Sequence, residues 1–153
     1  ISSAASDVYK RQIRGCALEL EAAFVNLIRN AVEAQTGINA SRLSGSPFLQ
    51  IRWQLNDGNV VIRLANNAPF VTQEELDNKI RPLVTDKTEG LGLGLQIVAS
   101  IIEAHSGDFR LCVLYDSGRA QQGTEISFAG VTAVITLPCS GEDKSSPTRT
   151  PVP

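Results

Sequence analysis

A glycine-rich stretch that runs directly into an apolar helix constrains this chain more than any other feature. Residues 85–95 read TDKTEGLGLGL, and the residues from Leu95 on, LQIVASIIEAH, have the spacing of a helix with one buried face. Glycine lets the backbone approach a ligand closely, and a helix start directs unpaired N–H groups and a positive dipole end at what lies before it. The stretch therefore predicts an anion site of the kind that holds phosphate, with a plain helix start or hinge as the simpler interpretation.

The composition fits one domain with its own hydrophobic core. The chain has 153 residues, 42% apolar and 20% charged, and a net charge of −2. It has no basic stripe, which argues against nucleic acid as a partner, and no apolar run near the ~20 residues of a membrane span. Because Cys16, Cys112 and Cys139 are scattered and the chain has one histidine, we expect no structural zinc site but a reduced, cytoplasmic domain.

The two ends differ in character from the middle of the chain. Residues 1–15 are small and polar without a period, which predicts an unstructured or foreign leader. Residues 139–153 are rich in proline, serine and threonine, which predicts a disordered tail. The folded domain is therefore expected over residues 16–138.

Residues 17–35 predict an amphipathic helix that carries two asparagines beside its apolar stripe. Asn26 and Asn30 lie one turn apart, although asparagine is a poor residue for a helix interior. One interpretation is a pair of amide oxygens at the edge of a pocket, suited to a hydrated Mg²⁺ ion. The other is that both asparagines are solvated or serve as caps.

The remaining segments alternate between strand and helix patterns. Residues 48–55 and 60–64 alternate apolar with polar around Asn-Asp-Gly-Asn, which is a strong hairpin signal. A loop is expected over 38–46, helices over 72–80 (with a capping box) and 92–104, and strands over 108–116, 125–128 and 132–137. This order predicts a two-layer α/β sandwich, with a mixed, mostly antiparallel sheet and helices on one face.

Three separated segments resemble the ATP-binding catalytic domain of sensor histidine kinases, in the superfamily that also holds gyrase-type and chaperone ATPases. NLIRNAVEA (26–34) is similar to the family's asparagine box, and VIRLANNAPFV (61–71) resembles its first glycine box. Residues 81–107 resemble the phenylalanine box, a short ATP lid and the second glycine box, and AVITLP (133–138) resembles the closing strand. The resemblance implies a Bergerat-type ATP-binding fold.

The same resemblance implies roles for individual residues. Asn30 would coordinate Mg²⁺, with Asn26 helping at the metal or the phosphates. Asn66 would accept a hydrogen bond from the adenine amino group, and Lys87 would neutralise phosphate charge. The backbone of the glycine segment would hold the phosphates of ATP: Gly90, Leu91, Gly92, Leu93 and Gly94.

The first glycine box departs from the family pattern. The chain has NNAPF where the family usually has DNGPG. Asn66 keeps an acceptor oxygen without a charge, so its hydrogen bond to adenine would be weaker than a charge-assisted one. Ala68 and Phe70 replace glycines, and Phe70 is expected to point away from the nucleotide. Thr124 is the candidate for a family threonine near adenine.

The implied function is that of a protein-histidine kinase in a bacterial two-component system. The domain would transfer the ATP γ-phosphoryl group to a histidine on a separate dimerisation domain, and a response regulator would follow in the phosphorelay. No residue of the chain itself is expected to act as a catalyst or acceptor, and His105 is expected to be structural. The domain would work in the cytoplasm without touching a membrane itself, also as part of a membrane-anchored sensor.

Two other functions stay open. A hydrolytic ATPase of the gyrase or chaperone type is disfavoured, because such enzymes place a glutamate one turn before the metal asparagine, where this chain has Asn26. The altered first glycine box motivates the second alternative, a non-catalytic module for nucleotide sensing or interaction.

Overall fold

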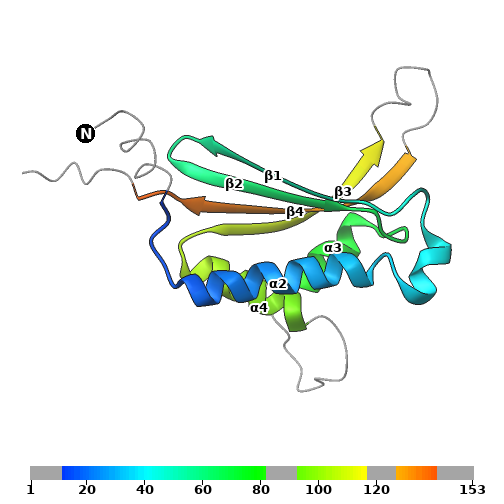
Figure 1. Ribbon diagram of the computed structural model, residues 1–153, viewed down its shortest axis with the longest axis horizontal. Coiled ribbons are helices and arrows are strands. Elements are labelled where there is room, and N and C mark those ends of the chain that lie inside the picture. Colours follow the sequence, from blue (N-terminus) through cyan, green and yellow to red (C-terminus); the bar gives the residue numbers. More distant parts are fainter. Residues whose placement is uncertain (1–11, 82–92, 117–126, 141–153) are drawn as a thin grey trace, which may run out of the picture.

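The computed structural model describes residues 12–81, 93–116 and 127–140, and in these ranges helices lie on one face of a sheet (Figure 1). The sheet has four strands in the order β1-β2-β4-β3, and all its described pairs are antiparallel. The predicted two-layer α/β sandwich is therefore confirmed. The elements are α2 (Ala17–Glu33), the 3-10 helix η1 (Gly37–Arg42), β1 (Leu49–Asn56), β2 (Asn59–Asn66), α3 (Gln73–Ile80), α4 (Leu93–Ala104), β3 (Asp108–Asp116) and β4 (Ser127–Pro138).

The core forms where α2 and α4 lie side by side over the sheet. Each helix buries residues spaced by four, because side chains at i and i+4 share one helix face. Small residues on α2 let the two helices approach closely. The buried cluster is Ala23, Leu27, Ala31, Leu64, Leu76, Val98, Ile102, Leu111, Ala133, Ile135 and Leu137.

Two local predictions were wrong. Residues 38–42, expected in a loop over 38–46, belong to η1, which begins at Gly37 with a φ of 61°. The two strands expected at 125–128 and 132–137 are one strand, β4, described from Ser127. The chain continues through Gly130 with a φ of 150°, and a Cβ there would collide with the carbonyl oxygen of Asn66. Glycine thus keeps the strand unbroken and lets β4 approach the end of β2.

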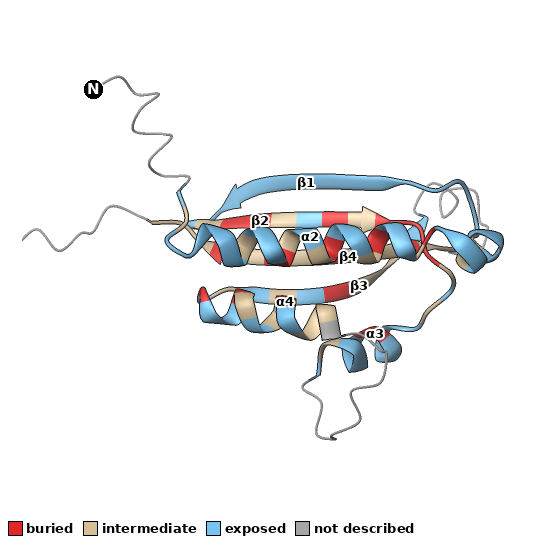
Figure 2. Cartoon of the chain, turned by 60° about the horizontal axis from the view of Figure 1, so that its bottom comes forward, coloured by how far each residue is buried: buried red, intermediate tan, exposed pale blue. Residues whose placement is uncertain are grey.

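The two edge strands of the sheet, β1 and β3, differ in how far other elements cover them. Beside β3, the side chain of Gln73 on α3 donates to the carbonyl of Leu111 at 2.7 Å and accepts from the N–H of Val113 at 3.0 Å. The amide thereby replaces a neighbouring strand. On the other edge, every residue of β1 is exposed (Figure 2). Ile51 pairs with the buried Leu64, so the apolar face of β1 is turned to the helix side of the sheet but is not covered there.

The described segments next to the predicted domain limits contact one another. The carbonyl of Gln12 accepts hydrogen bonds from the backbone N–H and the hydroxyl of Ser140, at 2.8 and 2.9 Å. Ile13 packs against the core. Within the described ranges, no helix is both long enough and apolar enough to cross a membrane.

Candidate functional site

A cavity of about 820 Å³ opens between the C-terminal half of α2, the end of β2, α3 and the first turn of α4. Its floor is made of core side chains from the sheet and helices, and polar side chains stand around it. The lining residues are Leu27, Asn30, Ala31, Glu33, Ala34, Asn39, Leu64, Asn66, Ala68, Pro69, Phe70, Val71, Glu75, Leu76, Asn78, Lys79, Leu95, Gln96, Leu111, Val131 and Ala133. An apolar floor with a few convergent polar groups is typical of a ligand site.

The structure brings Asn26, Asn30 and Gly94 together. The Nδ2 of Asn26 donates to the carbonyl of Ala22 at 3.0 Å. A Cβ at Gly94 would lie 3.6 Å from the Oδ1 of Asn26 and 3.7 Å from the Nδ2 of Asn30. The first turn of α4 therefore lies next to both amides of α2.

Asn66 lies at the end of β2, where it lines the same cavity, and is only 7% exposed. Its Nδ2 donates to the carbonyl of Asn67 at 2.8 Å, which fixes the amide and leaves Oδ1 as its acceptor. Across the sheet, Asn66 pairs with Val131 of β4. The adjacent side chain is thus apolar, and Thr124, the threonine considered for this neighbourhood, lies outside the described residues.

Part of the predicted phosphate site also lies outside the described residues. This applies to Lys87, Gly90, Leu91 and Gly92, and to the side chain of Leu93. Gly94 is the one member of the glycine segment whose surroundings are described, and it lies within α4. The predicted site is therefore described on its asparagine side, and its lysine and first glycines stay predictions.

The described donors suit Mg²⁺ better than a transition metal. No group of three histidine, cysteine, aspartate or glutamate side chains that would hold a metal occurs in the described ranges. Magnesium keeps several of its waters and is commonly bound through one or two protein oxygens and the substrate phosphates. A single amide oxygen from Asn30 fits that mode of binding.

Other cavity residues were not singled out from the sequence. Lys79 supplies a cation from α3, a helix whose capping box is formed as predicted. The backbone N–H of Thr72 donates to Glu75 at 2.8 Å and lowers the pKa of Glu75 from its ordinary value. The capping motif signalled the helix, but which of its side chains reach the cavity depends on how α3 docks against β3.

Phe70 was expected to point away from the nucleotide, and it is one of the residues that line the cavity. The side chain is nevertheless 74% exposed, so the ring stands at the mouth, where it leaves the interior open. The ring packs edge-to-face on Phe128, with centroids 5.4 Å apart and an interplanar angle of 65°.

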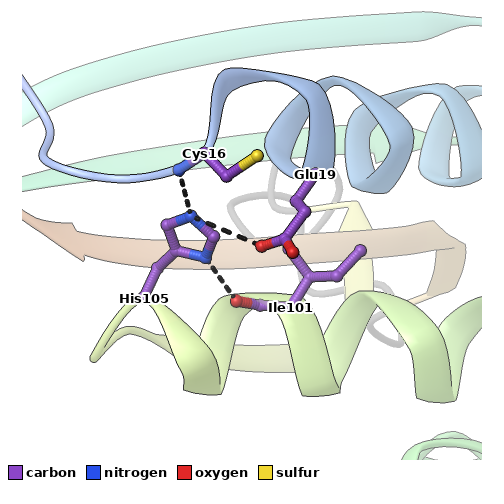
Figure 3. Close-up of polar contacts among 4 residues, drawn as sticks. All are labelled: Cys16, Glu19, Ile101 and His105. Atoms are coloured by element: carbon purple, nitrogen blue, oxygen red, sulfur yellow. Dashed lines mark hydrogen bonds and ion pairs between the residues drawn. The ribbon is translucent and has the colours of Figure 1, made fainter.

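His105 lies away from this cavity, at the opposite end of the two long helices (Figure 3). Its Nε2 accepts from the backbone N–H of Cys16 at 3.0 Å, and its Nδ1 lies 2.7 Å from the carbonyl of Ile101. An accepting Nε2 places the hydrogen on Nδ1, which donates to Ile101. The carboxylate of Glu19 is 4.0 Å from Nε2. The imidazole thus joins the start of α2 to the end of α4.

Known proteins share this fold and its motifs. The model of the family described as histidine kinase-, DNA gyrase B- and HSP90-like ATPase matches residues 15–139. Sporulation kinase B of Bacillus subtilis (strain 168) is 32% identical over 95 residues, which cover 62% of this chain and 21% of that protein. The C4-dicarboxylate transport sensor protein DctB of Rhizobium meliloti (strain 1021) is 30% identical over 96 residues, or 63% of this chain and 14% of that protein. The chain spans about a fifth or less of the length of these relatives.

Solved structures of histidine kinases share the fold of this chain. The catalytic domain of histidine kinase ThkA aligns with a TM-score of 0.57 and 26% identity, over 83% of this chain and 70% of that one. The mycobacterial sensor histidine kinase MprB shares the fold, with a TM-score of 0.59 at 20% identity over 82% and 74% of the two chains. The resemblance drawn from the sequence motifs is confirmed. The chain belongs to the histidine kinase-, DNA gyrase B- and HSP90-like ATPase family, as an ATP-binding catalytic domain of the sensor histidine kinase type.

Proposed function

We propose that this domain binds Mg-ATP in the cavity between α2 and α4 and donates the γ-phosphoryl group to a histidine on a separate dimerisation domain of its parent kinase. The observation that carries the proposal is that Gly94 lies next to Asn26 and Asn30, and that Asn30 and Asn66 line the same cavity. Phosphoryl transfer depends mainly on positioning and charge neutralisation, and these residues supply positioning groups at both ends of a nucleotide.

Each residue has a defined part in this proposal. Asn30 holds Mg²⁺ through its Oδ1, and Asn26 assists at the metal or the phosphates. Asn66 accepts from the adenine amino group. Lys87 neutralises phosphate charge, and the backbone of residues 90–94 binds the phosphate oxygens. Mg²⁺ supplies the further neutralisation that the transfer needs.

The side chain of Asn26 favours transfer over hydrolysis. A hydrolytic enzyme needs a base to activate water, and an amide cannot take up a proton in that role. The Nδ2 of Asn26 is moreover held by the carbonyl of Ala22. The phosphoryl group therefore passes to a histidine and then to a response regulator, both in the cytoplasm.

The test has two stages. Calorimetric titration of the chain with Mg-ATP should show saturable binding below millimolar ATP, and absence of binding would favour the non-catalytic module. Radiolabelled ATP is then supplied together with the histidine-bearing domain of a related sensor kinase. Label should move to that domain, whereas release of inorganic phosphate without labelled histidine would identify a hydrolase.

Variants test the metal and phosphate assignments. We expect Asn30→Asp and Gly92→Ala to abolish transfer. Asn56→Asp, at the exposed end of β1, is the matched control and should retain it. Unchanged transfer in both test variants would remove these assignments, and loss in the control would point to general damage.

A further inference from the structure

The proposed function leaves the placement of Phe70 unexplained. This residue follows a segment that is almost entirely buried, since Asn66, Asn67 and Ala68 are each less than 8% exposed. Phe70 itself is largely exposed, yet it lines the cavity. A large apolar ring in water at the mouth of a ligand site loses the free energy that burial would provide, unless a ligand covers it.

The ring is held in place by a neighbour on another element. Phe128 of β4 meets it edge-to-face, and the hydroxyl of Ser44 donates to the carbonyl of Phe128 at 3.1 Å. An edge-to-face pair engages the edge of one ring and one face of the other. Whichever ring contributes the edge, at least one face of Phe70 is left uncovered by Phe128.

The cavity offers space for a flat group near this ring. On its α2 side the lining includes Ala31 and Ala34, which are small, and Phe70 is its one aromatic side chain among the described residues. Asn66, four positions before Phe70, presents an amide acceptor to the same cavity. An acceptor beside an aromatic face is suited to a base that carries an amino group on a flat ring.

We infer that Phe70 stacks on the nucleobase of the bound nucleotide, with Phe128 as the residue that positions it. The inference rests on the proposed nucleotide site and adds to it a contact by which the chain selects an aromatic base. Stacking of a base on an aromatic side chain is worth about 1–3 kcal/mol, enough to change ATP affinity roughly tenfold or more.

The experiment compares Mg-ATP affinities by calorimetry for the wild-type chain and three variants. Phe70→Leu keeps an apolar side chain without the ring and should bind ATP about tenfold or more weakly. Phe70→Tyr keeps the ring and should bind as the wild type does. Phe48→Leu changes another partly exposed phenylalanine, one that does not line the cavity, and should have no effect.

A fluorescent base reports the stacking itself. The triphosphate of 8-vinyladenosine, a fluorescent adenosine that keeps the 6-amino group, should lose emission when its base stacks on the ring of Phe70, and this quenching should disappear in Phe70→Leu at saturating nucleotide. Equal ATP affinity and equal quenching in wild type and Phe70→Leu would overturn the inference and leave the nucleotide site intact. A Phe70→Tyr variant as weak as Phe70→Leu would also overturn it. Failure of the wild type to bind ATP would instead overturn the proposed function.

Discussion

The two edge strands of the sheet differ in their cover: α3 packs against β3, whereas β1 is exposed. On β3, α3 covers the edge, and the amide of Gln73 occupies the backbone groups of Leu111 and Val113. On β1, every residue is exposed, and its large apolar side chains on the helix side are about half exposed. The edge strand β3, which α3 covers, also borders the cavity, through Leu111 of β3 and Leu76 of α3. The short helix α3 thus both covers the edge of the sheet and lines the cavity.

The difference shows how one helix serves two purposes. An unpaired edge is a template for other strands, and proteins cover it with helices, charges or bulges. Here α3 supplies Gln73 to the edge at its first turn and Lys79 to the cavity at its last. Damage on the β3 side should therefore affect stability and nucleotide binding together, whereas changes on β1 should affect neither strongly.

Truncating a buried residue at the closed edge should have the largest effect. Leu76 is 2% exposed, and Leu76→Ala should lower the free energy of unfolding by about 2–5 kcal/mol, because it removes burial and leaves a cavity. Ile51→Ala on β1, where the side chain is 53% exposed, should cost less than about 1 kcal/mol. Urea denaturation followed by circular dichroism measures both. Similar losses for the two variants would mean that β1 is covered in solution.

Removing the side chain that closes the edge should have the next largest effect. Gln73→Ala breaks two hydrogen bonds to β3 and should cost about 1–2 kcal/mol. Gln54→Ala on the open edge is the matched control and should stay within about 0.5 kcal/mol of the wild type. Hydrogen exchange at the N–H of Val113 gives a local readout, since it should speed up in Gln73→Ala alone. Unchanged exchange there would contradict the closure of this edge by Gln73.

The cap of α3 should make a smaller, pH-dependent contribution. The pKa of Glu75 is lowered from its ordinary value near 4.5, chiefly by the hydrogen bond from the backbone N–H of Thr72. A carboxyl whose pKa is depressed on folding stabilises the fold above its unfolded pKa, and this contribution is lost as the pH falls through the folded pKa. Thermal unfolding of wild type and Glu75→Gln should therefore differ above pH 5 and converge as the pH falls through the lowered pKa of Glu75. Glu74→Gln serves as the control, and a gap that persists in acid would refute this account.

The smallest expected change is spectroscopic. Trp53 is the one tryptophan of the chain and is 58% exposed on β1. Because the side chain is 58% exposed, iodide should quench its fluorescence in the native protein clearly, though less than in urea. Strong protection in the native state would show that the open edge is shielded in solution, and the contrast between the two edges would then fail.

Much of the fold was predictable because its signals are local. Apolar spacing predicted α2 and α4, an Asn-Asp-Gly-Asn turn predicted the hairpin, and the capping box predicted α3. The continuity of β4 was not predictable from the sequence, because a glycine such as Gly130 usually indicates a break in a strand. Here Gly130 is needed because β4 approaches Asn66 so closely. The role of Gln73 was equally hidden, because a glutamine that closes a sheet edge has no local pattern.

The candidate site also has some residues with local sequence signals and others whose placement depends on long-range packing. Asn26, Asn30 and Asn66 were singled out from their motifs; in the structure Asn30 and Asn66 line one cavity, and Asn26 lies beside Gly94. Phe70 at the mouth was not predicted to line the cavity, since its placement depends on Phe128, which is far away in sequence. Long-range packing, rather than residue type, decides such positions.

The imidazole bridge between Cys16 and Ile101 has a mechanical consequence. It links the two long helices at one end, whereas the cavity of the candidate site lies near the other, about 20 Å along α2 from Cys16 at 1.5 Å per residue. Since Ala23 and Leu27 of α2 and Val98 and Ile102 of α4 share the buried core, these helices are held together along their length, and the imidazole adds a polar link that anchors the N-terminal end of α2.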